Sequence, residues 1–383
     1  MSDPRLRRLA EVVTGYSLAL GEGDLVLIQG PALAEPLLVE LARAAVERGA
    51  VPKTRLTIEG ADQAFLSRAS DEQLGWLPPY ALAEINAVDA TISIHADWNT
   101  RELAGIDPAR IALRQGAVRS VTQRFLERSA EGSLRWCVTA FPCEAFAQDS
   151  DMSLTAYEDF VYGAGWLDAD DPIAAWSAFA GRLTDLTSRL EKVRSLRVVA
   201  EDTDLTVGVG DRTWIASYGS RNFPDGEVFT GPIEDATSGH VRFSFPAAIG
   251  GREVNDVRLR FENGRVVESE ARTGQDYLRQ MLALDDGASS LGEFAIGTNY
   301  AVRRFTKQIL FDEKMGGTCH MALGAGYPNS GSRNRSALHW DMVCDLRSGG
   351  EIHADGEPIY RDGRFLPAFF EHSLDPPAAA TSA

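Results

Sequence analysis

The sequence predicts a mixed fold: an α/β region with an open parallel sheet, followed by an α+β region that is mostly antiparallel β. Three observations support this prediction. Helix and strand patterns alternate over residues 1–194, strands of period two dominate residues 195–372, and 383 residues are too many for one ordinary hydrophobic core. We therefore expect an N-terminal α/β domain over 1–194 and a C-terminal β-rich domain over 195–372. The tail, 373–383, is expected to contribute nothing to a core and to be disordered.

Strand and helix patterns alternate in the first half of the chain. Residues 5–20 have apolar side chains at helical spacing, and Leu25-Val26-Leu27-Ile28 is the short apolar run of a buried strand. A helix over about 34–47 and a strand over 54–58 complete a β-α-β unit, which implies a parallel sheet with a right-handed crossover. The alternation continues with helix at 62–86, strand at 90–94, helix at 107–128, strand at 134–140 and helices within 151–194.

The pattern changes at about residue 195, where polar and apolar side chains begin to alternate with a period of two. Such alternation is typical of antiparallel strands with one solvated face. Asn263-Gly264 lies between the alternating segments 257–261 and 265–268, and Asn-Gly in this position is the strongest short signal for a hairpin. A helix is expected over about 274–285. Further strands are expected at 196–200, 205–209, 213–216 and 241–245.

The composition argues against several classes of partner. The formal net charge is −17, whereas binding to nucleic acid or to an anionic membrane requires clustered Lys and Arg. No apolar run reaches the roughly 20 residues of a membrane-spanning helix, and the N-terminus lacks the apolar segment of a signal peptide. The four cysteines form no Cys-x-x-Cys pair, so we expect buried, reduced thiols and a cytoplasmic protein.

Two histidines and an aspartate lie in short apolar segments near the C-terminus. His339 and Asp341 flank Trp340 in a predicted strand, where residues i and i+2 point to the same face. His320 lies in a second predicted strand, which begins after Gly316-Gly317. Taken alone, such residues are more commonly hydrogen-bonded structural side chains than metal ligands.

Two glutamates stand in similar surroundings. Glu227 follows Asp225-Gly226 at the start of a predicted strand, and Glu293 lies among the apolar residues that follow Gly292. Either could simply be exposed, because a buried, unpaired carboxylate is costly. Together with the two histidines and the aspartate they form a mixed O/N ligand set, suited to Zn²⁺, Co²⁺ or Mn²⁺. Five ligands exceed the need of one catalytic zinc, which keeps a position open, so the set favours two metal ions.

Long segments around these residues resemble the signatures of the thermophilic aminopeptidase T and aminopeptidase S family of metallopeptidases. Tyr16-Ser17-Leu18 and Asp151-Met152-Ser153-Leu154 extend the resemblance into the first half, so that it covers nearly the whole chain. The segments of the second half that carry it are Asn222 to Pro232, Leu291 to Gly297, Asp312 to Gly324 and His339-Trp340-Asp341.

The resemblance implies a leucyl-aminopeptidase-like enzyme with a dinuclear metal centre. The positions that match the family's ligands are Glu227, Glu293, His320, His339 and Asp341. Glu293 is implied as the bridge between the metals, peptides with a free N-terminus as the substrates, and a homodimer as the assembly. Glu313 matches the glutamate of the family's Asp-Glu-Lys-x-Gly-Gly segment, and Tyr327 matches a tyrosine that assists at the site.

Such a site would hydrolyse peptide bonds with a water acidified by two metal ions, which also stabilise the oxyanion. Glu313 is our candidate for moving the proton to the leaving amine. Its alternative role is a helix-surface carboxylate paired with Lys314 or Arg303. Tyr327 is our candidate donor to the oxyanion, and its alternative role is a packed loop tyrosine.

Two other functions stay open at this level. One is a mononuclear non-haem iron ring-cleaving dioxygenase, since some dihydroxypyridine dioxygenases resemble this family. It would need only His320, His339 and Asp341, so the presence of Glu227 and Glu293 argues against it. The other is a non-catalytic binding protein stabilised by metal, which would lose thermal stability but no activity when the metal is removed.

Overall fold

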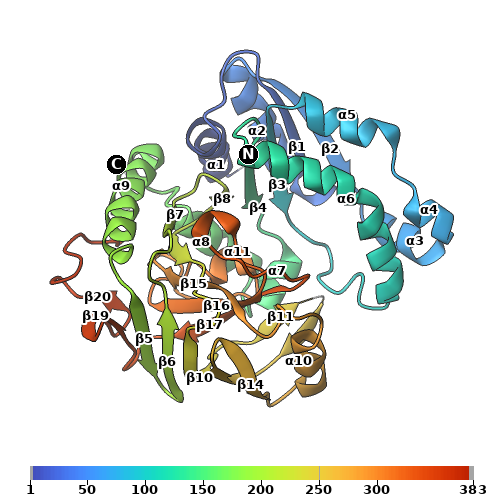
Figure 1. Cartoon of the computed structure of the whole chain (residues 1–383). Coiled ribbons are helices and arrows are strands. Elements are labelled where there is room, and N and C mark those ends of the chain that lie inside the picture. Colours follow the sequence, from blue (N-terminus) through green and yellow to red (C-terminus); the bar gives the residue numbers. More distant parts are fainter. Residues whose placement is uncertain (1–2, 250, 379–383) are drawn as a thin grey trace. The chain divides into compact units, whose positions relative to one another are not determined.

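The first half of the chain forms the parallel sheet that its sequence predicts. The computed structural model describes residues 3–249 and 251–378, and five parallel strands lie in the order β2-β1-β3-β4-β8 (Figure 1). Their bounds are Leu25–Pro31 for β1, Val51–Thr57 for β2, Ala90–His95 for β3, Arg135–Ala140 for β4 and Asn222–Phe223 for β8. The last strand was not predicted, because two residues are too short to show a period.

The helices of the first half differ from the prediction in three places. The segment 62–86, predicted to be mostly helix, contains three helices, because Ser70 makes a capping box with Gln73 and Pro79 begins a new helix. A short helix at Glu144–Asp149 was not predicted. The helix predicted over 5–20 is α-helical only to Val12 and continues as a π-helical turn, Val13–Ser17. The helices are α1 (Pro4–Val12), α2 (Glu35–Glu47), α3 (Ala61–Arg68), α4 (Asp71–Gly75), α5 (Pro79–Ala87), α6 (Pro108–Ala130), α7 (Glu144–Asp149) and α8 (Leu154–Ala164).

The second half forms an eight-stranded antiparallel sheet in the order β14-β13-β10-β6-β5-β18-β19-β20, and a two-stranded sheet, β11-β12. Asn263 and Gly264 have φ values of 49° and 77°, the left-handed conformation of a tight hairpin turn, as predicted. The bounds are β5 (Ser195–Ala200), β6 (Thr203–Gly208), β10 (Thr237–Arg242), β11 (Ala247–Ile249), β12 (Arg252–Val254), β13 (Arg258–Glu262), β14 (Arg265–Glu270), β18 (Glu351–Ala354), β19 (Glu357–Arg361) and β20 (Arg364–Phe365).

A third antiparallel sheet carries the candidate site. Its five strands lie in the order β17-β16-β15-β9-β7, and every residue of β15 and β16 is buried. The bounds are β7 (Ile215–Ser217), β9 (Glu227–Thr230), β15 (Leu291–Gly297), β16 (Thr318–Gly324) and β17 (His339–Asp345), with helices α9 (Pro172–Leu190), α10 (Gln275–Leu282) and α11 (Ile309–Asp312). The predicted fold class, parallel α/β followed by antiparallel α+β, is confirmed.

The chain divides into two compact units. The first contains the residues up to Ile173 and Gly219–Pro224, and the second contains Ala174–Tyr218 and the chain from Asp225 onward. The predicted boundary at residue 194 lies at the end of α9, but α9 belongs with the second unit, where Arg189 Nη1 donates to the carbonyl of Phe369 at 2.8 Å. Helical periodicity cannot reveal this, because it does not say which core a helix packs against.

The tail departs in part from its prediction. Leu374 is buried, and Asp375 pairs with Arg364 at 2.6 Å, so the tail is anchored at least to this point. Residues 379–383 lie outside the described part of the chain, and disorder there stays a prediction. Within the described ranges, no helix is long and apolar enough to cross a membrane.

Candidate metal centre

The register of the five-stranded sheet brings four of the predicted ligands to one face. Glu293 on β15 lies opposite Ala322 on β16, which in turn lies opposite Asp341 on β17. Residues opposite each other in neighbouring strands share a face, as do residues i and i+2 of one strand. His320 is two residues before Ala322, and His339 is two residues before Asp341. Both histidines therefore lie on the face that Glu293, Ala322 and Asp341 share. The small side chain of Ala322 leaves space between the two carboxylates.

Glu227 reaches the same face from the other side of β15. It begins β9, two residues before Phe229, and Phe229 lies opposite Ala295, whose other neighbour is His320. A β-bulge shifts the register of β15 just before Glu293. Bulges commonly redirect a side chain next to a functional site, and this one changes the register at a candidate ligand.

The turn before Glu227 requires a glycine. Gly226 has a φ of 130°, and a Cβ at this position would lie 2.8 Å from the Cβ of Asn299. The close approach allows Asn299 Nδ2 to donate to the carbonyl of Asp225 at 2.8 Å, while the amide of Thr298 donates to the carbonyl of Gly226 at 2.9 Å. These bonds hold the backbone from which Glu227 projects.

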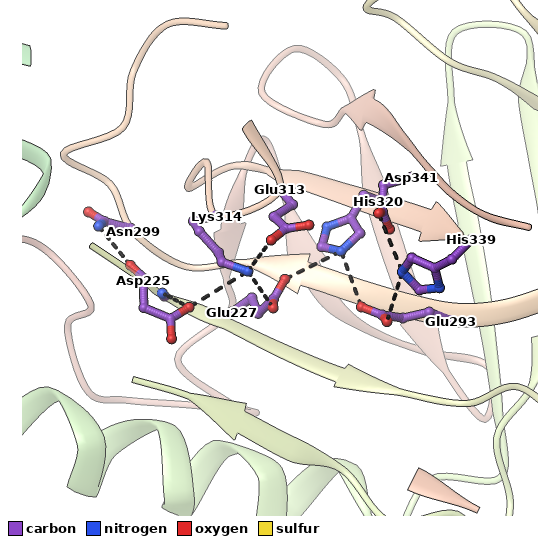
Figure 2. A network of polar contacts seen from close by, with 10 residues as sticks. Asp225, Glu227, Glu293, Asn299, Glu313, Lys314, His320, His339 and Asp341 are labelled. Atoms are coloured by element: carbon purple, nitrogen blue, oxygen red, sulfur yellow. Dashed lines mark hydrogen bonds and ion pairs between the residues drawn. The ribbon is translucent and has the colours of Figure 1, made fainter. Parts of the chain in front are cut away.

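The five predicted ligands meet around His320 and His339 (Figure 2). His320 Nε2 lies 3.3 Å from Glu227 Oε2 and 3.4 Å from Glu293 Oε1. Glu293 Oε2 lies 4.0 Å from His339 Nε2, so the two oxygens of Glu293 face different imidazoles. His339 Nε2 also lies 3.4 Å from Asp341 Oδ2. Residues that are 114 positions apart in the sequence thus form one continuous cluster.

The cluster contains two overlapping sets of potential ligand atoms. The Glu227 group consists of Glu227, Glu313 and His320, and the Glu293 group consists of Glu293, His320 and Asp341. Within each group, one atom from every residue lies within 4.8 Å of the others. His320 belongs to both groups, so they are two parts of one site.

The cluster fits a metal centre, because it contains buried polar atoms that make no hydrogen bond within the protein. Among the residues that the structure describes, these atoms are Glu227 Oε2, Glu293 Oε2, both ring nitrogens of His320 and Asp341 Oδ1. Leaving a buried polar atom unpaired costs about 1–3 kcal/mol, so such atoms are rare without a ligand.

The orientation of His339 also suits a metal ligand. Its Nδ1 lies 2.8 Å from the carbonyl oxygen of Ala325. A carbonyl can only accept, so Nδ1 carries the hydrogen, and in the neutral ring Nε2 has its lone pair directed toward Glu293 and Asp341. Metal-bound histidines are commonly held by such a bond from the other ring nitrogen.

Burial and charge shift the pKa values of the cluster in the absence of metal. Burial disfavours the charged form of His320, but Glu293 and Glu227 outweigh it and raise its pKa to about 9. Burial likewise opposes protonation of His339, but Asp341 raises its pKa to about 10. Burial raises the pKa values of Glu227 and Glu293 as well. The cluster therefore attracts cations, and protons are the ones it binds when no metal is present.

A buried lysine that the sequence did not identify as a site residue lies at one end of the cluster. Lys314 Nζ donates to Glu227 Oε1 at 2.6 Å and to Glu313 Oε1, and it lies 3.7 Å from Asp225 Oδ1. Its side chain is only 2% exposed. In the sequence, only its position next to Glu313 indicated a role at the site. The burial of its charge could not be predicted, because it depends on partners far away in the chain.

Glu313 is paired with Lys314, as its alternative role supposed, but it is not a surface side chain. Its side chain is 16% exposed, and its carboxylate faces Glu227 and His320. Tyr327 packs its ring 5.4 Å from that of Phe229 and 5.6 Å from that of His339. Tyr327 is 48% exposed, but partial loss of solvent around its hydroxyl and the nearby carboxylates, Glu293 first among them, raise its pKa, so the hydroxyl keeps a proton that it can donate.

Comparison with known proteins agrees with this geometry. Residues 2–365 match the sequence model of the thermophilic metalloprotease (M29) family. Aminopeptidase 2 of Geobacillus stearothermophilus is 28% identical over 95% of this chain and 98% of its own length. Aminopeptidase T of Thermus thermophilus is 28% identical over 94% of this chain and 96% of its own length.

Two solved structures have a similar fold. That of wild-type AmpT from Thermus thermophilus superposes with a TM-score of 0.85 at 25% identity, covering 95% of this chain and 99% of that one. That of 2,5-dihydroxypyridine dioxygenase from Pseudomonas putida KT2440 gives a TM-score of 0.60 at 13% identity, covering 96% and 98%, and shows a shared fold alone. With a family match over nearly its whole length and a cluster that fits metal ions, the chain belongs to the thermophilic metalloprotease (M29) family.

Proposed function

We propose that the protein is a metal-dependent aminopeptidase that holds two divalent ions, Zn²⁺, Co²⁺ or Mn²⁺. The ligands are Glu227, Glu293, His320, His339 and Asp341. The observation that carries the proposal is the set of buried oxygen and nitrogen atoms without hydrogen bonds on one face of the five-stranded sheet. The relatives that match nearly the whole chain, both named aminopeptidases, support the same activity.

The bound ions would acidify a water molecule and polarise the scissile carbonyl. Glu293 is the residue that would hold both ions, because its two oxygens face different imidazoles. Glu313 lies within the cluster and moves the proton from the attacking water to the leaving amine. Tyr327, next to His339, donates a hydrogen bond to the oxyanion of the tetrahedral intermediate.

The substrate is a peptide with a free N-terminus. Four acidic side chains take part in the two ligand groups, and an excess of carboxylates attracts an α-ammonium group. We further propose a homodimer in the cytoplasm. The assembly follows from the resemblance to the aminopeptidase T and aminopeptidase S proteins, and the compartment agrees with four buried cysteines that form no disulfide.

Metal analysis combined with a substrate panel tests the proposal. The purified protein would be analysed for bound metal per chain and assayed on amino-acid p-nitroanilides, with and without added Co²⁺ or Zn²⁺. We expect two ions per chain and metal-dependent release of p-nitroaniline. The matched N-acetyl-amino-acid p-nitroanilides, which lack the α-ammonium group, should not be cleaved.

The dioxygenase alternative predicts a different result. About one iron per chain, with no turnover of any p-nitroanilide, would reject the aminopeptidase. The structure favours two metals, because Glu227 and Glu293 lie in the same cluster as the three residues that one iron would need.

A further inference from the structure

Lys314 is a charged group at the site that the ligand set does not use. We propose that Lys314 is a positioning residue: it fixes one oxygen of Glu227 and one of Glu313, and its charge makes the Glu227 group the weaker of the two metal positions. This inference rests on the two-metal centre proposed above and adds an order of metal affinity to it.

Lys314 contacts only one of the two carboxylate oxygens of Glu227, so the two oxygens have different roles. Oε1 accepts from the ammonium at 2.6 Å. Oε2 has no hydrogen-bond partner and lies 3.3 Å from His320 Nε2. One oxygen is therefore held by the lysine while the other faces the shared imidazole (Figure 2). Glu313 is held from the same ammonium through its Oε1.

The position of the ammonium is itself fixed. The amide of Lys314 donates to the carbonyl of Phe311 at 3.0 Å, and its carbonyl accepts from the amide of Asn299 at 2.9 Å. The side chain is buried, and its charge is balanced by Asp225, Glu227 and Glu313. A buried ammonium that left these acceptors would lose its compensation, so it remains beside the cluster.

The two groups consequently offer different charge to a metal ion. In the Glu227 group, Lys314 contacts both carboxylates, Glu227 and Glu313, and offsets one of their two charges. Asp225 belongs to neither group and lies 3.7 Å from the ammonium on its other side (Figure 2), so its charge is farther from the metal position. The carboxylates of the Glu293 group, Glu293 and Asp341, instead face imidazoles that are neutral when they bind metal. A fixed positive charge repels a cation strongly where little water screens it. The Glu227 group should thus fill last.

A Co²⁺ titration of the full-length protein, stripped of metal by a chelator, tests this order. Binding would be followed by competition with a chromophoric chelator and by the visible absorption of Co²⁺. For wild type we expect two steps with dissociation constants at least about tenfold apart. In Lys314→Gln the weaker step should tighten at least about tenfold while the stronger changes less than about threefold. Lys314→Arg keeps the charge and should keep the separation of the two steps.

Two further variants show which group binds the more weakly held ion and provide a test that does not depend on the folding of Lys314→Gln. Glu227→Gln should remove the weaker step, and loss of the stronger step instead would overturn the assignment. Asp225→Asn keeps Lys314 but removes a nearby negative charge, so the weaker step should weaken by several-fold. This change in the weaker dissociation constant is opposite in sign to that expected for Lys314→Gln. It tests the effect of charge on the Glu227 group even if Lys314→Gln does not fold.

The outcomes separate this inference from the proposed function. Equal weakening of both steps in Lys314→Gln, or an unchanged separation, would show that Lys314 only supports the structure. One ion in wild type and two in Lys314→Gln would support the proposal, whereas one ion in both would overturn it. A wild type that binds two unequal ions but hydrolyses no peptide would reject the aminopeptidase and leave the role of Lys314 standing.

Discussion

The Glu227 group and the Glu293 group balance their negative charge by different means. Glu227 pairs with the buried ammonium of Lys314, whereas Glu293 faces the rings of His320 and His339, which carry charge only when protonated. The Glu227 group therefore has a permanent positive charge beside it. The Glu293 group has one only when an imidazole is protonated or a metal ion is bound. The comparison indicates that the Glu293 group depends more on metal and should respond more strongly when it is damaged.

The largest effect should come from Glu293→Ala. Removing the proposed bridge should lower kcat/KM at least about 10³-fold, because the metals supply several kcal/mol of transition-state stabilisation. We expect the fold to persist, because Glu227 and Asp341 still face the imidazoles of His320 and His339 in the variant. Steady-state kinetics and circular dichroism would measure both properties.

Glu351→Ala is the matched control for this variant. Glu351 is also a strand glutamate, but it pairs at the surface with His353 and Arg361. Its loss should change the melting temperature little, because solvent screens this surface pair, and should leave activity unaltered. Full activity of Glu293→Ala would reject the bridge.

Removal of metal should give the next largest effect, on stability. Free metal at 1,000 times its dissociation constant stabilises the folded state by about 4 kcal/mol, and a chelator removes this contribution. The melting temperature should therefore fall. Because the Glu293 group should depend more on metal, we expect Glu227→Gln to retain more of the metal-dependent rise in melting temperature than Glu293→Gln. Scanning calorimetry would measure this rise in both variants. Equal melting temperatures with and without metal would speak against a metal centre.

Tyr327→Phe should give a smaller loss. Removing one hydrogen-bond donor to an oxyanion costs about 10²–10³-fold in kcat. KM should change little, because the ring contacts with Phe229 and His339 remain in the variant. Initial-rate kinetics separate the two constants. A change in KM alone would assign Tyr327 to packing or substrate binding.

The last expected effect concerns metal affinity alone, which should depend on pH. With pKa values raised to about 9 and 10, His320 and His339 are protonated at neutral pH in the metal-free protein. Metal must displace these protons, so affinity should rise about tenfold per pH unit for each proton released and level off above the raised pKa values. Co²⁺ competition titrations between pH 6 and 9 would measure the slope. A slope of zero would show that no ligand loses a proton.

Much of the fold could be predicted from local pattern. Alternation of short strands with helices predicted the parallel sheet, and Asn263-Gly264 predicted the hairpin between β13 and β14. The division of the segment 62–86 into three helices has local causes in Ser70 and Pro79, which end and begin helices, whereas the spacing of apolar residues does not show these breaks. The strand β8 was missed because two residues carry no period.

The candidate site shows the same division between local and distant information. The sequence by itself determined that His339 and Asp341 share a face, since strand geometry alone requires it, and the structure confirms that their side chains face each other. The row from Glu293 through Ala322 to Asp341 depends on register between strands, which only the folded sheet decides. The role of Lys314 depends on Glu227, 87 residues away, because the burial of a charge is set by partners that folding brings to it.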